Sequence, residues 1–212
     1  IVKNILGIGI SPFAMNATAC LVSIFVNQRL LEYGGDLAVG AFGIANRVAF
    51  IFIMINFGVN QGMQPIAGYN YGAQNYDRLM RVLKLAMIAG TCVTTSGFIV
   101  AEFMPHLCVR LFTNDKVLTD LAVNGIRIMM TAMPIVGYQM IVTNFFQSIG
   151  KAKISIFLSL SRQLLFLVPL IGVMPVFFGV NGVWVAMPIS DSFSAIFALV
   201  MMVRYMRVFK KR

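Results

Sequence analysis

The segment Asn4–Gln28, NILGIGISPFAMNATACLVSIFVNQ, contains 25 consecutive residues without a charged side chain. As an α-helix rising about 1.5 Å per residue, it is long enough to cross a hydrocarbon layer roughly 30 Å thick. A second uncharged segment, Ile128–Gly150, contains 23 residues and has the same capacity. Across all 212 residues only 11% are charged and 59% are hydrophobic, whereas a soluble domain carries about 25% charged residues. The sequence therefore predicts an integral membrane protein.

Hydrophobic segments separated by turn residues predict six transmembrane helices in one bundle. Gly, Asn and Asp gather at the breaks, as in Tyr33–Asp36 and Gly72–Asn75, and such clusters favour turns. Short connections imply that neighbouring helices run antiparallel, and six spans place both ends on one side of the membrane. The predicted spans are approximately 6–31, 38–68, 84–105, 125–148, 154–177 and 181–204. We therefore expect an all-α integral membrane fold.

Two connections have features of short helices. From Tyr76 to Leu83 apolar residues recur at i, i+3, i+4 and i+7, which predicts a cytoplasmic surface helix leading into the third span. Asn114 is a candidate N-cap for a second short helix over residues 115–124 on the outer side. A solvated helix without a further role is the simpler interpretation of both segments.

Basic residues are distributed unevenly among the connections. One set of connections contains Lys3, Arg78, Arg81, Lys84, Lys151, Lys153, Arg204, Arg207, Lys210, Lys211 and Arg212, and the opposite set contains Arg29, Arg110, Lys116 and Arg127. Because Lys and Arg are retained on the cytoplasmic side, both ends of the segment are predicted to be cytoplasmic in a multi-pass plasma (inner) membrane protein. The net charge of +10 comes without any zinc-finger, RRM or homeodomain pattern, so we expect no nucleic-acid partner.

The residues needed for metal, redox or hydrolytic chemistry are sparse. The three cysteines, Cys20, Cys92 and Cys108, form no CxxC pair, and His106 is the only histidine. A nucleophile, a base and an orienting acid do not occur at workable spacing. We therefore expect no enzymatic activity, no cofactor and no metal site.

Three ionisable residues are predicted to lie deep in the membrane. At 1.5 Å per residue, Arg47 and Arg162 are roughly 12 Å from the nearest ends of their spans, and Asp191 is roughly 15 Å from its own. A charge at that depth costs about 3 kcal/mol or more unless it is paired or hydrated. We therefore expect Asp191 to contact Arg47 or Arg162, either as a static link within the bundle or as part of a proton or cation relay.

Uncharged polar residues form stripes along three predicted helices. Such stripes should face protein or water and not lipid, and links between helices explain them more often than a substrate path does. Nearby Met and Phe residues, such as Met133, Met140 and Phe145, favour a path because methionine and aromatic surfaces adapt to varied apolar ligands. The candidate path residues are Asn16, Asn27, Asn56, Asn60, Gln64, Tyr138, Gln139, Thr143 and Gln147.

The segment Gln61–Ala73, QGMQPIAGYNYGA, followed by Gln74-Asn75-Tyr76, closely resembles the signature after the eighth span of MATE (multidrug and toxic compound extrusion) transporters. Four further segments look like that family and follow its order. They are Tyr33–Ala38 (YGGDLA), Leu111–Asp115 (LFTND), Phe145–Ala152 (FFQSIGKA) and Gly182–Trp184 (GVW). The resemblance covers the whole chain and matches spans seven to twelve of the family.

The resemblance implies a twelve-span carrier made of two six-helix lobes related by a pseudo-two-fold axis, with substrate between the lobes. Entry of Na⁺ or H⁺ would drive a drug, often an organic cation, outward. Residues 1–212 would then be the carboxyl-terminal lobe, and the amino-terminal lobe of the same polypeptide would be its partner, together with the lipid bilayer and a small-molecule substrate. Ile1 in place of a methionine agrees with a chain that begins inside a longer protein.

One part of the family pattern does not carry over. A MATE branch uses acidic residues in its seventh and tenth spans for the coupling cation, but Asn4–Gln28 and Ile128–Gly150 contain no carboxylate. Another branch places its essential acid in the first span of the amino-terminal lobe. Asp191 is therefore a candidate from depth alone, and the coupling ion remains Na⁺ or H⁺. Two alternatives stay open: a lipid-linked precursor flippase of the same superfamily, and a non-transporting six-span scaffold.

Overall fold

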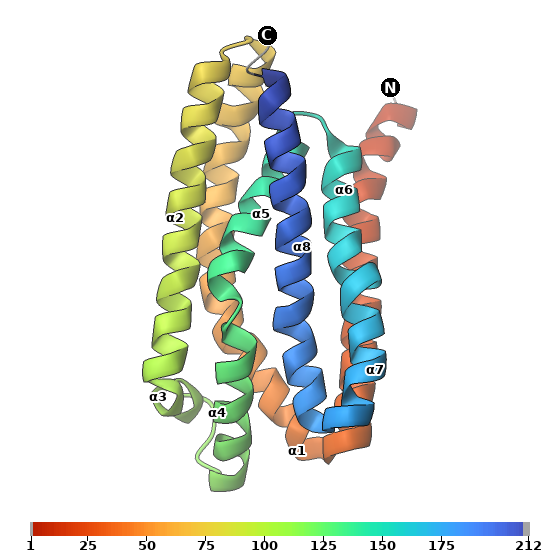
Figure 1. Cartoon of the computed structure of the whole chain (residues 1–212), viewed down its shortest axis with the longest axis vertical. Coiled ribbons are helices and arrows are strands. Elements are labelled where there is room, and N and C mark those ends of the chain that lie inside the picture. The colour runs from red at the N-terminus through yellow and green to blue at the C-terminus, as the bar shows by residue number, and fades with distance from the viewer. Residues whose placement is uncertain (1, 210–212) are drawn as a thin grey trace.

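The computed structural model describes residues 2–209, and side-chain surroundings for residues 16–206. Every regular element in this range is a helix, which confirms the predicted all-α fold. The helices are α1 (Val2–Gly72), α2 (Tyr76–Phe103), α3 (Pro105–Arg110), α4 (Lys116–Met130), α5 (Met133–Ser148), α6 (Ala152–Leu160), the π-helix η1 (Ser161–Leu167), α7 (Val168–Phe178) and α8 (Val180–Phe209). The long helices run along one axis, and α1 begins at the end of the bundle where α8 finishes (Figure 1).

Helix α1 is a hairpin of two arms. Gly35 has φ 66° and ψ −168°, which interrupts the helical conformation, and glycine adopts this left-handed φ without the steric cost that a Cβ would add. The chain reverses direction there, so the two arms lie on different sides of the bundle (Figure 1). In the described residues, α1, α2, the α6–α7 run, α8 and the bent α4–α5 pair are each long and apolar enough to span a membrane. With two arms in α1, the bundle has six passes.

The predicted surface helix Tyr76–Leu83 is wrong. These residues form the first two turns of α2, which continues without interruption to Phe103. Leu79 and Leu83 are fully buried in an apolar cluster that also contains Phe145 and Phe146. The amphipathic pattern was real, but its apolar stripe packs onto α5 and not onto the membrane surface.

The predicted helix over residues 115–124 is likewise part of a longer element. It is the first portion of α4, and Asp115 caps that helix in place of Asn114. The Asp115 carboxylate accepts a hydrogen bond from the backbone N–H of Leu118 at 3.0 Å. A break at Thr131–Ala132 and a bend of 52° then separate α4 from α5. Pro134 lies in the first turn of α5, where its missing N–H is tolerated.

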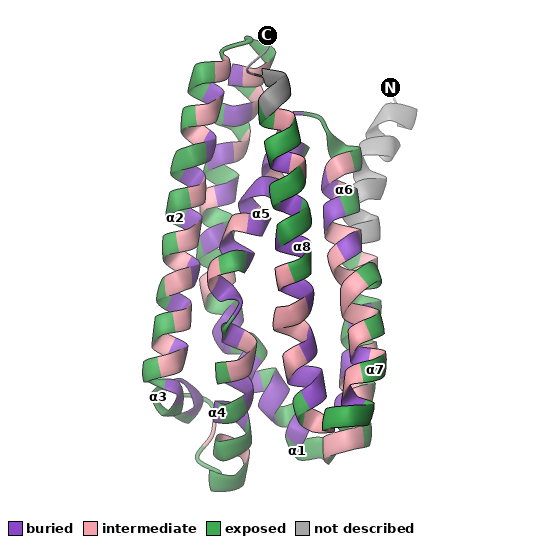
Figure 2. Cartoon of the chain, viewed as in Figure 1, coloured by how far each residue is buried: buried purple, intermediate pink, exposed green. Residues whose placement is uncertain are grey.

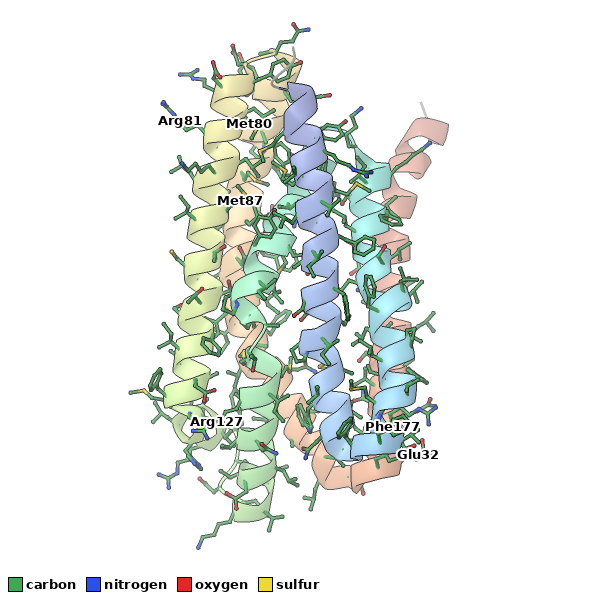
Figure 3. All side chains as sticks on the ribbon, in the orientation of Figure 1. Glu32, Met80, Arg81, Met87, Arg127 and Phe177 are labelled. Atoms are coloured by element: carbon green, nitrogen blue, oxygen red, sulfur yellow. The ribbon has the colours of Figure 1, made fainter. Side chains whose placement is uncertain are left out.

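The core consists of two apolar clusters placed one beyond the other along the bundle. The cluster far from the ends of the chain contains Phe42 and Trp184, whose rings meet edge to face at 5.7 Å. The second cluster, nearer those ends, contains Phe145, Phe146 and Met202. Buried positions point inward, while many outward positions are exposed (Figure 2). Large apolar side chains such as Phe177 lie on that outer surface (Figure 3), as expected of a surface that faces lipid.

Candidate functional site

Polar side chains occupy the level of the bundle between the two apolar clusters. Four elements contribute to it: Asn56 and Asn60 come from α1, Gln139 from α5, Arg162 from η1 and Asp191 from α8. Apart from Arg162, these residues are buried. Buried polar groups must find partners or lie beside a cavity, so this polar level is the candidate functional site.

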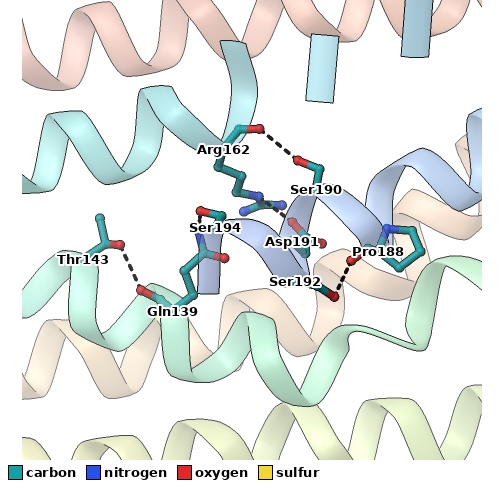
Figure 4. A network of polar contacts seen from close by, with 8 residues as sticks. All are labelled: Gln139, Thr143, Arg162, Pro188, Ser190, Asp191, Ser192 and Ser194. Atoms are coloured by element: carbon teal, nitrogen blue, oxygen red, sulfur yellow. Dashed lines mark hydrogen bonds and ion pairs between the residues drawn. The ribbon is translucent and has the colours of Figure 1, made fainter. Parts of the chain in front are cut away.

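An ion pair lies at the centre of the polar level. Arg162 Nε is 2.7 Å from Asp191 Oδ1, and the two side chains are 35% and 12% exposed. Figure 4 shows the guanidinium directed at the carboxylate. Asp191 was expected to pair with Arg47 or Arg162, and its partner is Arg162. Arg47 is exposed on the second arm of α1.

The π-helix η1 presents Arg162 to α8. A π-helix has i→i+5 hydrogen bonds, which interrupt the regular α-helical pattern. Such segments are rare overall, and those that occur are often found at functional sites. The Arg162 carbonyl oxygen accepts a hydrogen bond from the Ser190 hydroxyl at 2.9 Å (Figure 4). Neighbouring residues of α8 thus hold residue 162 twice, Ser190 at the backbone and Asp191 at the side chain.

A second set of contacts joins α5 to α8. The Gln139 side-chain amide on α5 donates to the Ser194 hydroxyl on α8, and within α5 the Thr143 hydroxyl donates to the backbone carbonyl of Gln139 at 2.9 Å (Figure 4). Gln139 Oε1 and Gln163 Oε1 are buried and have no hydrogen-bond partner among the described residues. An unpartnered buried oxygen is costly, so both atoms are acceptors that lack a donor among the described residues.

Two cavities adjoin at the ion pair. The first, here the methionine cavity, has a volume of about 320 Å³ and is lined by Ala19, Val22, Ser23, Val26, Phe42, Asn46, Ala49, Ile53, Met129, Met130, Met133, Val136, Arg162, Gln163, Leu167, Met187 and Asp191. The second, here the amide cavity, has a volume of about 330 Å³ and is lined by Asn16, Ala19, Phe57, Gln139, Met140, Thr143, Asn144, Gln147, Ser159, Arg162 and Gln163. Arg162 and Gln163 belong to both linings, so η1 forms part of the boundary between the cavities.

The candidate path residues separate into two groups. Asn16, Gln139, Thr143 and Gln147 line the amide cavity. The linings of the two cavities do not include the remaining candidates Asn27, Asn56, Asn60, Gln64 and Tyr138.

The stripe on the second arm of α1 contacts protein. Asn56 Nδ2 lies 3.7 Å from Met140 Sδ, and Gln64 Nε2 donates to Asn144 Oδ1 at 3.4 Å. Asn60 Nδ2 donates to the Asn56 carbonyl at 3.1 Å. Two of the three residues therefore link α1 to α5, which matches the more frequent of the two interpretations offered for such a stripe.

Sequence reasoning missed several residues of the site. Ser190 and Ser194 flank Asp191 on α8 at the spacing of one helical turn, and Gln163 directly follows Arg162. A search for small polar residues within one turn of each deep charge would have found all three. The π-helix left no comparable signal, because no residue pattern in Ser161–Leu167 (SRQLLFL) marks an i→i+5 hydrogen-bond register.

Among the described residues, no group of three His, Cys, Asp or Glu side chains could hold a metal ion. Cys20 and Cys92 are exposed and Cys108 is buried. Cys108 lies in the short helix α3 beyond the end of α2, where burial raises the pKa of its thiol.

The polar level offers hydrogen bonds, one ion pair and adaptable apolar walls, which suit binding of a solute.

A protein-family model and several curated proteins match this chain. A protein-family model, MatE, matches residues 11–171. Multidrug export protein MepA of Staphylococcus aureus (strain bovine RF122 / ET3-1) is 24% identical over 197 residues, which cover 93% of this chain and 43% of MepA. MepA of Staphylococcus haemolyticus (strain JCSC1435) has the same identity and coverage. The chain thus spans less than half the length of these curated relatives.

Solved structures agree with the family match. The MATE multidrug transporter DinF-BH superposes with a TM-score of 0.85 at 36% identity, covering 99% of this chain and 47% of DinF-BH. An outward-facing MATE family transporter of the MOP superfamily gives a TM-score of 0.92 at 20% identity, covering 100% of this chain and 48% of that one. At that identity the second likeness concerns the fold alone.

Proposed function

Because this chain belongs to the MatE family, we propose that it forms the carboxyl-terminal six-helix half of a secondary transporter. The whole transporter would export amphipathic organic compounds in exchange for Na⁺ or H⁺. The amino-terminal six-helix half of the same polypeptide would supply the other wall of the path. The coverage of less than half of each relative supports this division.

The observation that carries the proposal is the pair of adjoining cavities in the middle of the bundle. A protein that only links or supports others in the membrane would be expected to pack this level closely, as it packs the two apolar clusters. Here the level contains polar side chains and about 320 and 330 Å³ of space. Methionine and aromatic walls beside a few polar groups are typical of sites that accept varied apolar ligands.

The residues would have different roles in such a path. Asn16, Gln139, Thr143 and Gln147 would contact solute or its water in the amide cavity. Asp191 is the only carboxylate among the described residues that line either cavity, which makes it the candidate for interaction with a coupling ion or a cationic solute. Asn56 and Gln64 would fix α1 against α5.

We further propose that the end of the bundle where α8 finishes faces the cytoplasm of an inner membrane. Exposed basic residues gather there, including Arg78, Arg81, Lys84 and Arg204, and Figure 3 shows Arg81 at that end. Glu32 and Arg127 lie at the opposite end (Figure 3). This asymmetry supports the orientation through retention of Lys and Arg on the cytoplasmic side.

Transport in proteoliposomes tests the proposal. The native polypeptide that contains this chain is reconstituted, loaded with a fluorescent amphipathic cation, and exposed in turn to an imposed H⁺ gradient and an imposed Na⁺ gradient. We expect the dye to move against the direction of one of the two ions, and the effective gradient identifies the coupling ion.

Empty liposomes and liposomes carrying the surface variant Arg127→Gln serve as controls. Dye that stays in place under both gradients would contradict drug export. Translocation of a labelled lipid without dye movement would instead favour the flippase of the same superfamily.

A further inference from the structure

We propose that Arg162 is a tethered cation that occupies Asp191, and that an amphipathic organic cation entering the methionine cavity displaces it. Arg162 would then set the affinity of the site by competing with the ligand for the one carboxylate. The inference rests on the proposed function for its biological setting, although the binding that it concerns requires no ion gradient.

The methionine cavity has the chemistry of a site for a lipophilic cation. Four methionines and Phe42 supply much of its apolar lining, and Asp191 supplies its single negative charge. Methionine is flexible and polarisable, so such walls can adapt to the shape of a bulky apolar ligand. The carboxylate then fixes the charged centre, which is the usual division of roles in a ligand cavity.

The contact between Arg162 and Asp191 is suited to exchange. It joins Nε to Oδ1 at 2.7 Å and does not use the bidentate fork in which two guanidinium N–H groups bind one carboxylate. The ion pair uses Nε of Arg162 and not its Nη atoms. The side chain is 35% exposed and lines both cavities.

The backbone of residue 162 is held independently of its side chain. The Ser190 hydroxyl donates to the Arg162 carbonyl at 2.9 Å, and this bond does not involve the guanidinium. Loss of the ion pair therefore leaves η1 attached to α8. The side chain can leave Asp191 by rotation about its own bonds, without separation of the two helices.

The amide cavity offers a second position for the displaced guanidinium. Arg162 lines this cavity as well as the methionine cavity. Gln139 and Gln163 also line it, and their Oε1 atoms have no partner among the described residues. Because a guanidinium has only donors, these two acceptors fit the group that leaves Asp191.

Binding of tetraphenylphosphonium, a lipophilic cation, tests the inference. The native polypeptide that contains this chain is purified into lipid nanodiscs and titrated by calorimetry without any ion gradient. Removal of the internal competitor in Arg162→Gln should tighten binding by about tenfold or more, because the whole population becomes competent to bind. Asp191→Asn should weaken binding by a similar factor.

A second variant covers the case in which Arg162→Gln does not fold. The pair Gln139→Leu with Ser194→Ala replaces both partners of one hydrogen bond, a change that is close to neutral for folding. Neither residue lines the methionine cavity. The variant nevertheless removes Gln139 Oε1, one of the two acceptors for the displaced Arg162. Because displacement of Arg162 then becomes less favourable, we expect tetraphenylphosphonium to bind several-fold more weakly.

Arg127→Gln, at the end of the bundle, is the matched control and should bind as the wild type does. Triphenylphosphine oxide, an uncharged probe of similar shape, should respond to none of the changes. The inference is overturned if folded Arg162→Gln binds no more tightly than wild type, or if the Gln139/Ser194 variant binds as wild type does. If the variants bind tetraphenylphosphonium as the wild type does while dye transport persists, the inference alone is contradicted. If the binding affinities change as expected but no dye is transported, only the proposed function is contradicted.

Discussion

Helix α5 contacts the rest of the bundle in two different ways. Toward α2 it packs closely through small residues: a Cβ added at Gly137 would lie 2.8 Å from the Gly90 carbonyl oxygen and would also collide with the Thr94 hydroxyl. Toward η1 it borders the amide cavity. Toward α8 the Gln139 amide donates to the Ser194 hydroxyl, and Gln139 Oε1 has no partner among the described residues. One helix thus has a closely packed side and an open side.

The difference shows how a membrane bundle can combine rigidity with a path. Small residues let helix backbones approach closely where no solute has to pass. On that side the Thr94 hydroxyl donates to the Gly90 carbonyl at 3.0 Å, and the buried oxygen Asn56 Oδ1, beside Gly90, has no partner among the described residues. On the open side the buried carboxylate of Asp191 is present as well, and native proteins tolerate such a group mainly at functional sites. Four substitutions, ordered by expected effect, test this contrast.

The largest effect is expected from Gly137→Val on the closely packed side. The added side chain must push against a helix backbone that cannot move without disturbing α2, so we expect a loss of about 3 kcal/mol or more. Thermal unfolding of the purified protein measures it. Gly62→Val, where a Cβ meets nothing within 4 Å, is the matched control, and equal stability of the two variants would contradict the close packing.

Arg162→Gln on the open side should have the next largest effect. Removing one partner of a fully buried ion pair costs about 3–5 kcal/mol; since the Arg162 side chain is about a third exposed, we expect about 2 kcal/mol. Adding Asp191→Asn should restore part of the loss, because no uncompensated charge remains. A double variant less stable than Arg162→Gln would show that the pair does not behave as a coupled unit.

Ser194→Ala should destabilise the protein by about 1 kcal/mol, because it leaves the Gln139 amide without its partner. Combining it with Gln139→Leu should bring stability back close to wild type, since both polar groups are then gone. Denaturant unfolding of the three variants gives the comparison. If the double variant loses as much as the two single changes added together, the hydrogen bond between α5 and α8 is not the source of the effect.

The smallest effect is expected for Arg127→Gln. Arg127 and Glu102 lie 3.9 Å apart with side chains 49% and 43% exposed, and such exposed pairs contribute at most about 1 kcal/mol. We expect a change below about 0.5 kcal/mol that disappears in 1 M salt, where the screening length falls to about 3 Å. A loss as large as that of Arg162→Gln would remove the distinction between surface and central ion pairs.

The sequence carried enough information for the fold class, because long uncharged segments such as Asn4–Gln28 can be stable only in lipid. The cost of an unpaired charge in the membrane also predicted that Asp191 pairs with Arg47 or Arg162, and the structure shows that the partner is Arg162. Element boundaries were less predictable. Tyr76–Leu83 has the same amphipathic pattern whether its apolar stripe meets a membrane surface or α5, and only the tertiary contacts of Leu79 and Leu83 decide between them.

Only part of the site was predicted, because the spacing of polar residues does not reveal their tertiary contacts. Polar residues at helical spacing show that a helix has a polar face, but spacing does not show whether that face meets another helix or a cavity. Asn56 and Gln64 proved to link helices, whereas Gln139 and Thr143 also line the amide cavity. The contribution of Gln163 depends on the π-helix, whose hydrogen-bond register has no residue signature.

The central claim is that the methionine cavity is a water-accessible path for solute while the outer face of α2 meets lipid. Ser23, which lines that cavity, and Ser96 on α2 are both exposed serines. Each is replaced in turn by cysteine in a variant of the native polypeptide from which all other cysteines have been removed. Labelling by a charged, membrane-impermeant thiol reagent is followed with and without tetraphenylphosphonium. We predict rapid labelling of Ser23→Cys that tetraphenylphosphonium slows, and no labelling of Ser96→Cys. Equal labelling at the two positions, or labelling of Ser23→Cys that the cation leaves unchanged, would contradict the claim.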